Sequence, residues 1–275
     1  MQRFHDRTVL ITGASSGIGA ALAHECAAQG ARLVLLARRL ELLEALARSL
    51  RLTGATVHVY RCDVTDETQL PAVVADLARQ DIVLDMVVAN AGFGVVGRFD
   101  ALSLADYQRQ FDTNVFGVIR TAYATLEMLR RSRGSLVIMG SITGYIAQPG
   151  ASAYAMSKFA VRALAESLRI ELGPEGIAVT LISPGVIESN LRRVDNRGVF
   201  HPHAREPFPA WLRTPAQTAA RRMVRAIHAR KAEQVITLHG WLAVFMARHL
   251  PWILRQMLKR GLQARPQARA DDSAS

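Results

Sequence analysis

A short hydrophobic run near the N-terminus leads directly into a glycine-rich turn. Residues 8–13 read TVLITG, and the turn TGASSGIG (12–19) opens an alanine-rich helical stretch. In parallel α/β sheets, a turn of this kind lets the backbone approach the pyrophosphate of a dinucleotide, and the free N–H groups at the helix start bind the anion. The spacing, with three residues between the first two glycines, differs from the common GxGxxG pattern. The predicted cofactor contacts in this turn are Gly13, Ser15, Ser16, Gly17, Ile18 and Gly19.

Apolar runs and helical stretches alternate along most of the chain. The further strand-like runs are 31–37, 56–63, 85–92, 134–141, 177–185 and 234–238. Continuous Val, Ile and Leu runs are typical of parallel strands that are buried on both faces. We therefore predict an α/β fold, a Rossmann-type doubly wound parallel sheet of about seven strands with helices on both faces. Residues 1–240 are expected to form one such domain, in which the Pro-rich stretch 191–215 is a substrate loop or lid.

Two adjacent arginines follow the second apolar run. That run ends at Ala37, Arg38 and Arg39 come next, and the first acidic residue after them is Glu41. An acidic side chain at this point binds the ribose 2′-hydroxyl of NAD, whereas arginine suits the 2′-phosphate of NADP. The pair favours NADP(H) as the cofactor, and a solvated pair of helix-start residues is the alternative.

The segment SAYAMSKFA (152–160) carries a tyrosine and a lysine four positions apart. Tyr154 and Lys158 then lie on the same face of a helix, close enough to interact. Only three of the 34 basic residues are lysine, and no other lysine precedes Lys231. Arginine, with its broad and permanently charged fork, would not be equivalent to a compact ammonium. By themselves, the two residues are either a core aromatic beside a solvated charge or a reactive pair.

Six motifs occur in the order and the context of one protein family. They are Thr12, Gly13, Gly17 and Gly19 of a TGxxxGxG turn, Asn90-Ala91-Gly92, Asn114 in TNVFG, Ser141 in VIMGS, Tyr154 with Lys158, and Pro184-Gly185. From about residue 7 to residue 190, the chain resembles the classical short-chain dehydrogenase/reductase family. The resemblance implies cofactor contacts from Asp63, Val64, Asn90, Ala91, Gly92, Tyr154, Lys158, Pro184, Gly185, Ile187 and Ser189. Ser189 stands where the family often has a threonine, and it keeps the hydroxyl.

The resemblance further implies that Asn114, Ser141, Tyr154 and Lys158 are catalytic. Reduction of a ketone needs a hydride at carbon and a proton at oxygen, and a tyrosine can donate the proton. An unperturbed tyrosine has a pKa of about 10, so a working acid near neutral pH needs a shift of roughly three units, or about 4 kcal/mol. One positive charge about 4 Å away is worth on the order of 4 kcal/mol at an effective dielectric constant near 20. Lys158 is expected to supply most of this shift.

In the family picture, Ser141 orients the substrate oxygen, and Asn114 holds a water that connects Lys158 to solvent. The expected function is an NADP-dependent interconversion of a carbonyl and an alcohol, on an apolar substrate, in a homodimer or homotetramer. The alternative is a protein that keeps the fold to sense a nucleotide without catalysis, and the intact set of four catalytic residues speaks against it.

The net charge of +11 lies entirely in the last third of the chain. Residues 1–190 hold 18 basic and 18 acidic side chains, and residues 191–275 hold 16 basic and 5 acidic ones. A neutral body with a basic end does not suggest a nucleic-acid binder, because such proteins spread cations along a phosphate backbone.

The basic end contains an amphipathic stretch at 241–262, followed by an expected disordered tail at 263–275. Leu250, Ile253, Leu254, Met257 and Leu258 share one helix face, opposite the cations of the same stretch. This helix either packs on the domain or a second subunit, or lies on an anionic membrane with its tryptophans at the lipid boundary.

Other residues suggest no further site. Cys26 and Cys62 are too few for a disulfide framework, and the N-terminus lacks a signal-peptide pattern, so we expect a cytoplasmic protein, peripheral at most on the inner face of the membrane. His201 and His203 have no cysteine or carboxylate at metal-ligand spacing, and we predict no metal.

Overall fold

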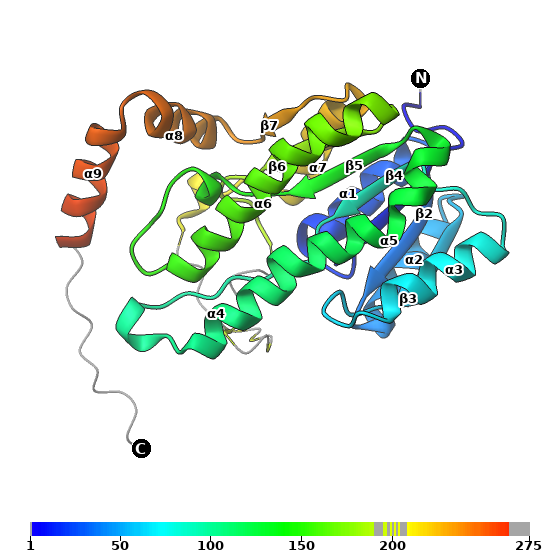
Figure 1. The fold of residues 1–275 in the computed structure, drawn as a ribbon, viewed down its shortest axis with the longest axis horizontal. Helices are drawn as coiled ribbons and strands as arrows, with labels where there is room; N and C mark the ends of the chain where they lie inside the picture. The colour runs from blue at the N-terminus through cyan, green and yellow to red at the C-terminus, as the bar shows by residue number, and fades with distance from the viewer. Residues whose placement is uncertain are drawn as a thin grey trace, which may run out of the picture.

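One parallel sheet organises the molecule, with the strand order β3-β2-β1-β4-β5-β6-β7 (Figure 1). The structure is a computed structural model that describes residues 2–189, 195–196, 199, 201, 203 and 208–263. The strands are β1 Thr8–Thr12, β2 Arg32–Ala37, β3 Val57–Arg61, β4 Met86–Ala89, β5 Ser135–Met139, β6 Ala178–Ser183 and β7 Glu233–Val235. Every residue of β1, β4 and β5 is buried, as expected of central parallel strands. The predicted fold class is confirmed.

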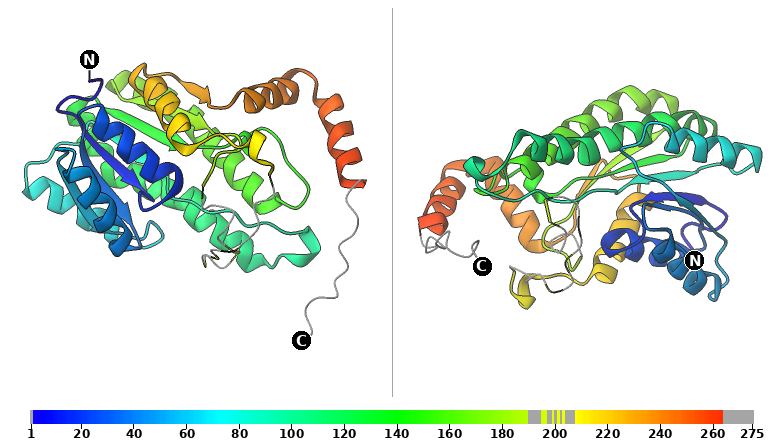
Figure 2. Two further views of the ribbon diagram at one scale, coloured as in Figure 1. Left: turned by 180° about the vertical axis from the view of Figure 1, so that it is seen from behind. Right: turned by 90° about the horizontal axis from the view of Figure 1, so that it is seen from below.

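Helices cover both faces of the sheet (Figure 2). Helices α1, α2 and α7 bury their apolar residues on one face, and α3, α5 and α6 bury theirs on the other. The helices are α1 Gly17–Ala28, α2 Leu40–Arg51, α3 Gln69–Arg79, α4 Leu104–Phe111, α5 Gly117–Ser132, α6 Ser152–Leu172, α7 Ala216–His228, α8 Leu238–His249 and α9 Pro251–Gln263. Short helical turns are η1 Phe99–Ala101, η2 Asp112–Phe116, η3 Ile142–Gly144, η4 Gly173–Glu175 and η6 Ala210–Leu212.

The C-terminal region is divided more finely than the sequence pattern suggested. The single helix predicted over 241–262 is two helices, because Pro251 has no N–H to continue α8 and instead begins α9. The last strand, β7, ends at Val235, whereas the sequence pattern predicted a run up to residue 238. It ends early because Thr237 is the N-cap of α8, where its side chain accepts a hydrogen bond from the Gly240 N–H. Much of the predicted substrate loop 191–215 and residues 264–275 lie outside the described residues.

The strand order reverses between β1 and β4, where parallel sheets of this type bind their ligands at the carboxyl ends. The side chain of Thr12 joins the two strands there. Its hydroxyl accepts hydrogen bonds from the N–H groups of Asn90 and Ala91, both at 3.0 Å. The Asn90 amide in turn donates to the Thr12 carbonyl at 2.9 Å. These bonds fix the glycine turn after β1 against the turn after β4.

Candidate active site

A cleft of about 330 Å³ opens at the carboxyl ends of the strands. Every residue predicted to contact the cofactor lines it. These are Gly13, Ser15, Ser16, Gly17, Ile18, Gly19, Arg38, Arg39, Asp63, Val64, Asn90, Ala91, Gly92, Tyr154, Lys158, Pro184, Gly185, Ile187 and Ser189. Ser141 lines the same cleft, so three of the four predicted catalytic residues share it with the glycine turn.

The glycine turn between β1 and α1 has a conformation that other residues would strain. The φ angles of Gly13 and Gly17 are +66° and +57°, in the left-handed region. A Cβ on Gly13 would lie 2.8 Å from the Ala91 Cα, and a Cβ on Gly19 would lie 2.7 Å from the Asn90 side-chain nitrogen. The turn therefore packs closely against the residues that follow β4. Because its glycines have no side chains, their backbone atoms are accessible from the cleft.

The start of α1 suits an anion. The hydroxyl of Ser16, the N-cap residue, does not accept from the helix backbone, and the first turn of α1 contains no acidic side chain. The first N–H groups of a helix carry a partial positive charge and need acceptors, which phosphate oxygens provide. This geometry fits the pyrophosphate of a dinucleotide.

The two arginines after β2 have different surroundings. Arg39 is partly buried and donates to the hydroxyls of Ser15 and Ser16 at 3.1 and 3.0 Å. The side chain of Arg38 is 65% exposed, and its guanidinium lies 3.9 Å from the Asp63 carboxylate. Both cations stand at the rim of the cleft, on the side of the glycine turn.

The turn after β3 is fixed by hydrogen bonds within itself. The Asp63 carboxylate accepts from the Thr65 N–H at 3.0 Å and from the Thr65 hydroxyl at 2.9 Å. The Asp63 N–H donates to the Gln69 side chain at 2.8 Å. Cys62, beside it, lines the cleft, but burial raises the pKa of its thiol to about 11, so it is a poor nucleophile.

Tyr154 and Lys158 project from the first turns of α6 into the cleft. The Lys158 Nζ lies 5.7 Å from the centre of the Tyr154 ring. It also donates to the carbonyl of Met139, the last residue of β5, at 2.8 Å. This bond ties the ammonium to the strand that ends just before Ser141, and so brings the three side chains together.

Burial controls the charge of Lys158. The side chain is only 7% exposed, and desolvation lowers the pKa of its ammonium to about 8. Desolvation disfavours the charged form of a buried amine, and the Met139 carbonyl offsets part of that cost. The ammonium is thus the main form at neutral pH, and it loses its proton as the pH rises past about 8.

Ser141 is nearly buried and bonded to its own turn. Its oxygen accepts from the Thr143 N–H at 3.1 Å, and its hydroxyl donates to the Thr143 hydroxyl at the same distance. The serine therefore has a fixed position at the cleft wall.

Asn114 lies beneath the cleft wall, in the π-helical turn η2 that joins α4 to α5. Its side chain is completely buried and exchanges two hydrogen bonds with the backbone of Phe93, at 3.0 and 3.1 Å. It also donates to the Ser157 hydroxyl, next to Lys158, at 3.2 Å. A π-helical turn inserts one extra residue, and such turns occur often at functional sites. Asn114 connects the loop after β4 with the helix that carries Tyr154 and Lys158.

Sequence patterns did not reveal His239, which lies against the Pro184-Gly185 turn. Its Nε2 accepts a hydrogen bond from the Val186 N–H at 3.2 Å, so this nitrogen carries no proton and the imidazole is neutral. Burial lowers the pKa of His239, which favours the same form. No local motif marks this histidine, because its partner lies 53 positions earlier in the chain.

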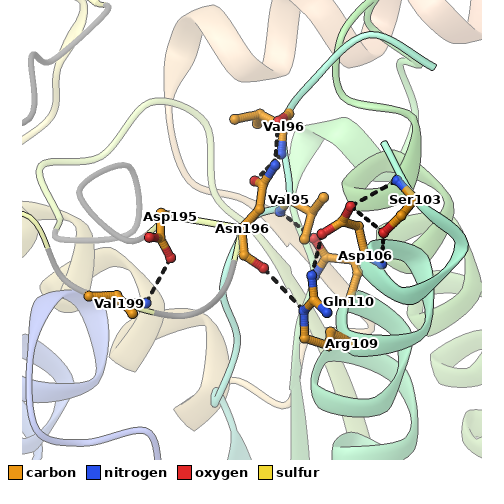
Figure 3. A network of polar contacts seen from close by, with 9 residues as sticks. All are labelled: Val95, Val96, Ser103, Asp106, Arg109, Gln110, Asp195, Asn196 and Val199. Atoms are coloured by element: carbon orange, nitrogen blue, oxygen red, sulfur yellow. Dashed lines mark hydrogen bonds and ion pairs between the residues drawn. The ribbon is translucent and has the colours of Figure 1, made fainter. Parts of the chain in front are cut away.

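One further contact joins the predicted substrate loop to the loop after β4 (Figure 3). The Asn196 side-chain amide accepts from the Val96 N–H at 3.0 Å and donates to the Val96 carbonyl at 2.9 Å. Arg109 of α4 donates to the Asn196 carbonyl. In the same loop, the His201 Nε2 and the Asp195 carboxylate share a hydrogen bond of 2.8 Å. Among the described residues, no group of three or more His, Cys, Asp or Glu side chains could hold a metal ion.

Comparison with known proteins identifies the family. The model of the family described as short chain dehydrogenase matches residues 7–199. The chain belongs to this family. An 11-beta-hydroxysteroid dehydrogenase A of Sesamum indicum is 34% identical over 268 residues, which are 91% of this chain and 75% of that protein. An uncharacterized oxidoreductase of Myxococcus xanthus is 35% identical over 231 residues, which are 78% and 91% of the two chains. The chain is thus an oxidoreductase of the short-chain dehydrogenase family.

Solved structures of short-chain dehydrogenases share its fold. One from Sphingobium yanoikuyae, in complex with NADPH, superimposes with a TM-score of 0.74 at 30% identity and covers 98% of this chain and 100% of its own. One from Burkholderia phymatum, in complex with NAD, has a TM-score of 0.80 at 25% identity. The match covers 93% of this chain and 97% of that chain. These neighbours support a nicotinamide dinucleotide as the cofactor. Among the described residues, no helix combines the length and the apolar character that a bilayer crossing requires.

Proposed function

We propose that this short-chain dehydrogenase is an NADP-dependent enzyme that interconverts a carbonyl group and an alcohol on an apolar substrate. The observation that carries the proposal is the position of Tyr154, Lys158 and Ser141 along the same cleft as the glycine turn. A phenol, a buried ammonium and a second hydroxyl beside a dinucleotide site are the groups that carbonyl reduction uses. The apolar side chain of Phe93, which lines the cleft and is not among the predicted cofactor contacts, supports an apolar substrate.

Each side chain has a separate part in this proposal. The dinucleotide, when bound, supplies or accepts the hydride. Tyr154 gives a proton to the substrate oxygen during reduction and takes it back during oxidation. Lys158 favours the deprotonated form of Tyr154 by its charge, and the bond to Met139 holds its ammonium in place. The Ser141 hydroxyl turns from Thr143 when the substrate binds and donates to the substrate oxygen, on which negative charge develops.

Asn114 is a positioning residue in this proposal. Its bonds to Phe93 and Ser157 hold the loop after β4 against the helix of Tyr154 and Lys158. In the family, the corresponding asparagine holds a water that leads from the lysine to solvent, and we propose the same role here.

The preference for NADP is supported by the two arginines at the cleft rim. The serine hydroxyls orient the Arg39 guanidinium at the glycine turn, and Arg38 projects beside it. A 2′-phosphate can form charge-assisted, two-pronged hydrogen bonds with a guanidinium, which a ribose hydroxyl cannot replace.

The proposed reaction is tested with the purified protein, NADPH and a panel of apolar ketones, by following the absorbance of the reduced nicotinamide. Turnover is expected, and Tyr154→Phe should lower it by at least about a hundredfold while NADPH binding is nearly unchanged. NADPH binding without turnover of any ketone would instead favour the nucleotide sensor. Binding of NADH as tight as that of NADPH would contradict the assignment of the arginines.

We further propose a cytoplasmic homodimer or homotetramer. Exposed apolar side chains on the outer surfaces of α5 and α6 support assembly, above all Tyr123 at 77% and Ile170 at 79% exposure. Large exposed apolar groups on adjacent helices are typical of subunit interfaces. Light scattering after size-exclusion chromatography would measure the assembly, and the double variant Tyr123→Arg, Ile170→Arg should shift it toward the monomer.

A further inference from the structure

Helices α8 and α9, residues 238–263, form an arm that projects from the carboxyl end of the sheet (Figures 1 and 2). Val244 of α8 packs against Tyr145 and Ile146, which follow Ser141 in the chain. Leu254 and Leu258 of α9 are partly buried against the same cluster. The apolar stripe that the sequence showed on α9 therefore contacts protein in part, and it anchors the arm beside the candidate active site.

The outer face of α8 is apolar and uncovered by the described residues. Leu238, Trp241, Leu242 and Phe245 are 79%, 54%, 52% and 41% exposed. Their spacing places them on one side of the helix. The rings of Trp241 and Phe245 stack at 5.6 Å between centres, so they form a continuous ridge. We call these four residues the α8 ridge.

Positive charge follows the α8 ridge along the chain, on α9, and no acidic residue lies in the arm. The sequence contains neither Asp nor Glu between positions 234 and 270. Arg255, Lys259 and Arg260 of α9 are exposed, and none of them forms an ion pair with the described part of the chain. Arg248 is different, because it bonds Glu233 at 2.9 Å and is thereby tied to the sheet. Trp252 and Met257, 67% and 57% exposed, lie among the free cations.

We propose that the arm docks on the surface of an anionic phospholipid bilayer. The α8 ridge enters the boundary between headgroups and acyl chains, where tryptophan is favoured, and the α9 cations contact the anionic headgroups. A second copy of the chain fits the arm less well, since a symmetric contact would bring the same unpaired cations together without an acidic partner. The docked arm holds the end of the protein that carries Ser141 close to the membrane.

The experiment is flotation of the full chain with phosphatidylcholine vesicles, with and without phosphatidylglycerol. Flotation is expected with the anionic vesicles and should weaken as ionic strength rises. Trp241→Ser together with Phe245→Ser should lower the vesicle partition coefficient by at least about tenfold, because two large apolar side chains are lost from the boundary. Lys259→Gln and Arg260→Gln should each lower it by about fivefold, on anionic vesicles only.

Matched control variants carry the same changes on a distant surface. Leu52, 89% exposed after α2, is changed to Ser, and the exposed Arg48 of α2 is changed to Gln. Both should float like the unchanged chain, and circular dichroism should show all variants folded. The proposal fails if the unchanged chain does not float with anionic vesicles, or if the arm variants float as it does. It also fails if the chain is an oligomer that the Trp241, Phe245 variant dissociates, since a second copy would then cover the α8 ridge.

Discussion

Removal of the Lys158 ammonium should change the way in which stability depends on pH. The side chain is buried, and in the folded protein its pKa is about 8 instead of the ordinary 10.5. The proposed variant is Lys158→Met, which keeps the length of the side chain and removes the titrating group. To exclude titration of the neighbouring phenol, both chains also carry Tyr154→Phe.

The sign follows from the two pKa values of Lys158. Between pH 8 and 10.5, the unfolded chain holds a proton that the folded chain has released, so the free energy of unfolding rises with pH. From pH 7 to pH 9.5, this group alone contributes a rise of about 2 kcal/mol. Cys26, Cys62 and Tyr145 act in the opposite direction, because burial raises the pKa of each. Their effects are common to both chains and cancel in the difference.

The assay is urea unfolding of both chains at pH 7 and pH 9.5, followed by far-ultraviolet circular dichroism. The bond to Met139 is stronger for the ammonium than for the neutral amine, and this difference is already part of the folded-state pKa from which the change is worked out. The chain with Lys158 should gain about 2 kcal/mol relative to the Met variant as the pH rises. An equal pH dependence in the two chains, with equal denaturant slopes, would refute the reasoning from burial.

Substitutions at three further positions test the site. Gly19→Ala should abolish dinucleotide binding in a fluorescence titration, since its Cβ would lie 2.7 Å from the Asn90 side chain, and retained affinity would show that the turn can shift. Arg39→Ala should weaken NADPH binding by about tenfold or more and leave NADH binding nearly unchanged, whereas an equal loss for both would place the guanidinium away from the 2′-phosphate. His239→Leu should weaken NADPH binding because the Val186 N–H loses its acceptor, and His239→Gln should restore much of it. Equal affinities of the two His239 variants would contradict a positioning role.

The fold could be predicted because its signals are local. Strands buried on both faces must be apolar throughout, so β1, β4 and β5 are visible as continuous runs. The glycine turn is equally local, since positive φ angles at Gly13 and Gly17 require residues without a side chain. Tyr154 and Lys158 meet because they share one helix face. The resemblance to the family added the order of the motifs, and the cleft lies where the strand order predicts it.

Other features depend on contacts between distant parts of the chain, which the hydrophobic periodicity of a sequence does not reveal. The sequence shows an apolar stripe on α9, but only the tertiary structure shows that Leu254 and Leu258 contact protein while the α8 ridge stays exposed. The acceptor for Lys158, the carbonyl of Met139, comes from another strand, and the partner of His239 comes from another turn. The sequence by itself determined the sheet, the glycine turn and the identities of the reactive groups. The tertiary structure decided their burial and hydrogen-bond partners, because desolvation and long-range pairing exist only after the chain has packed.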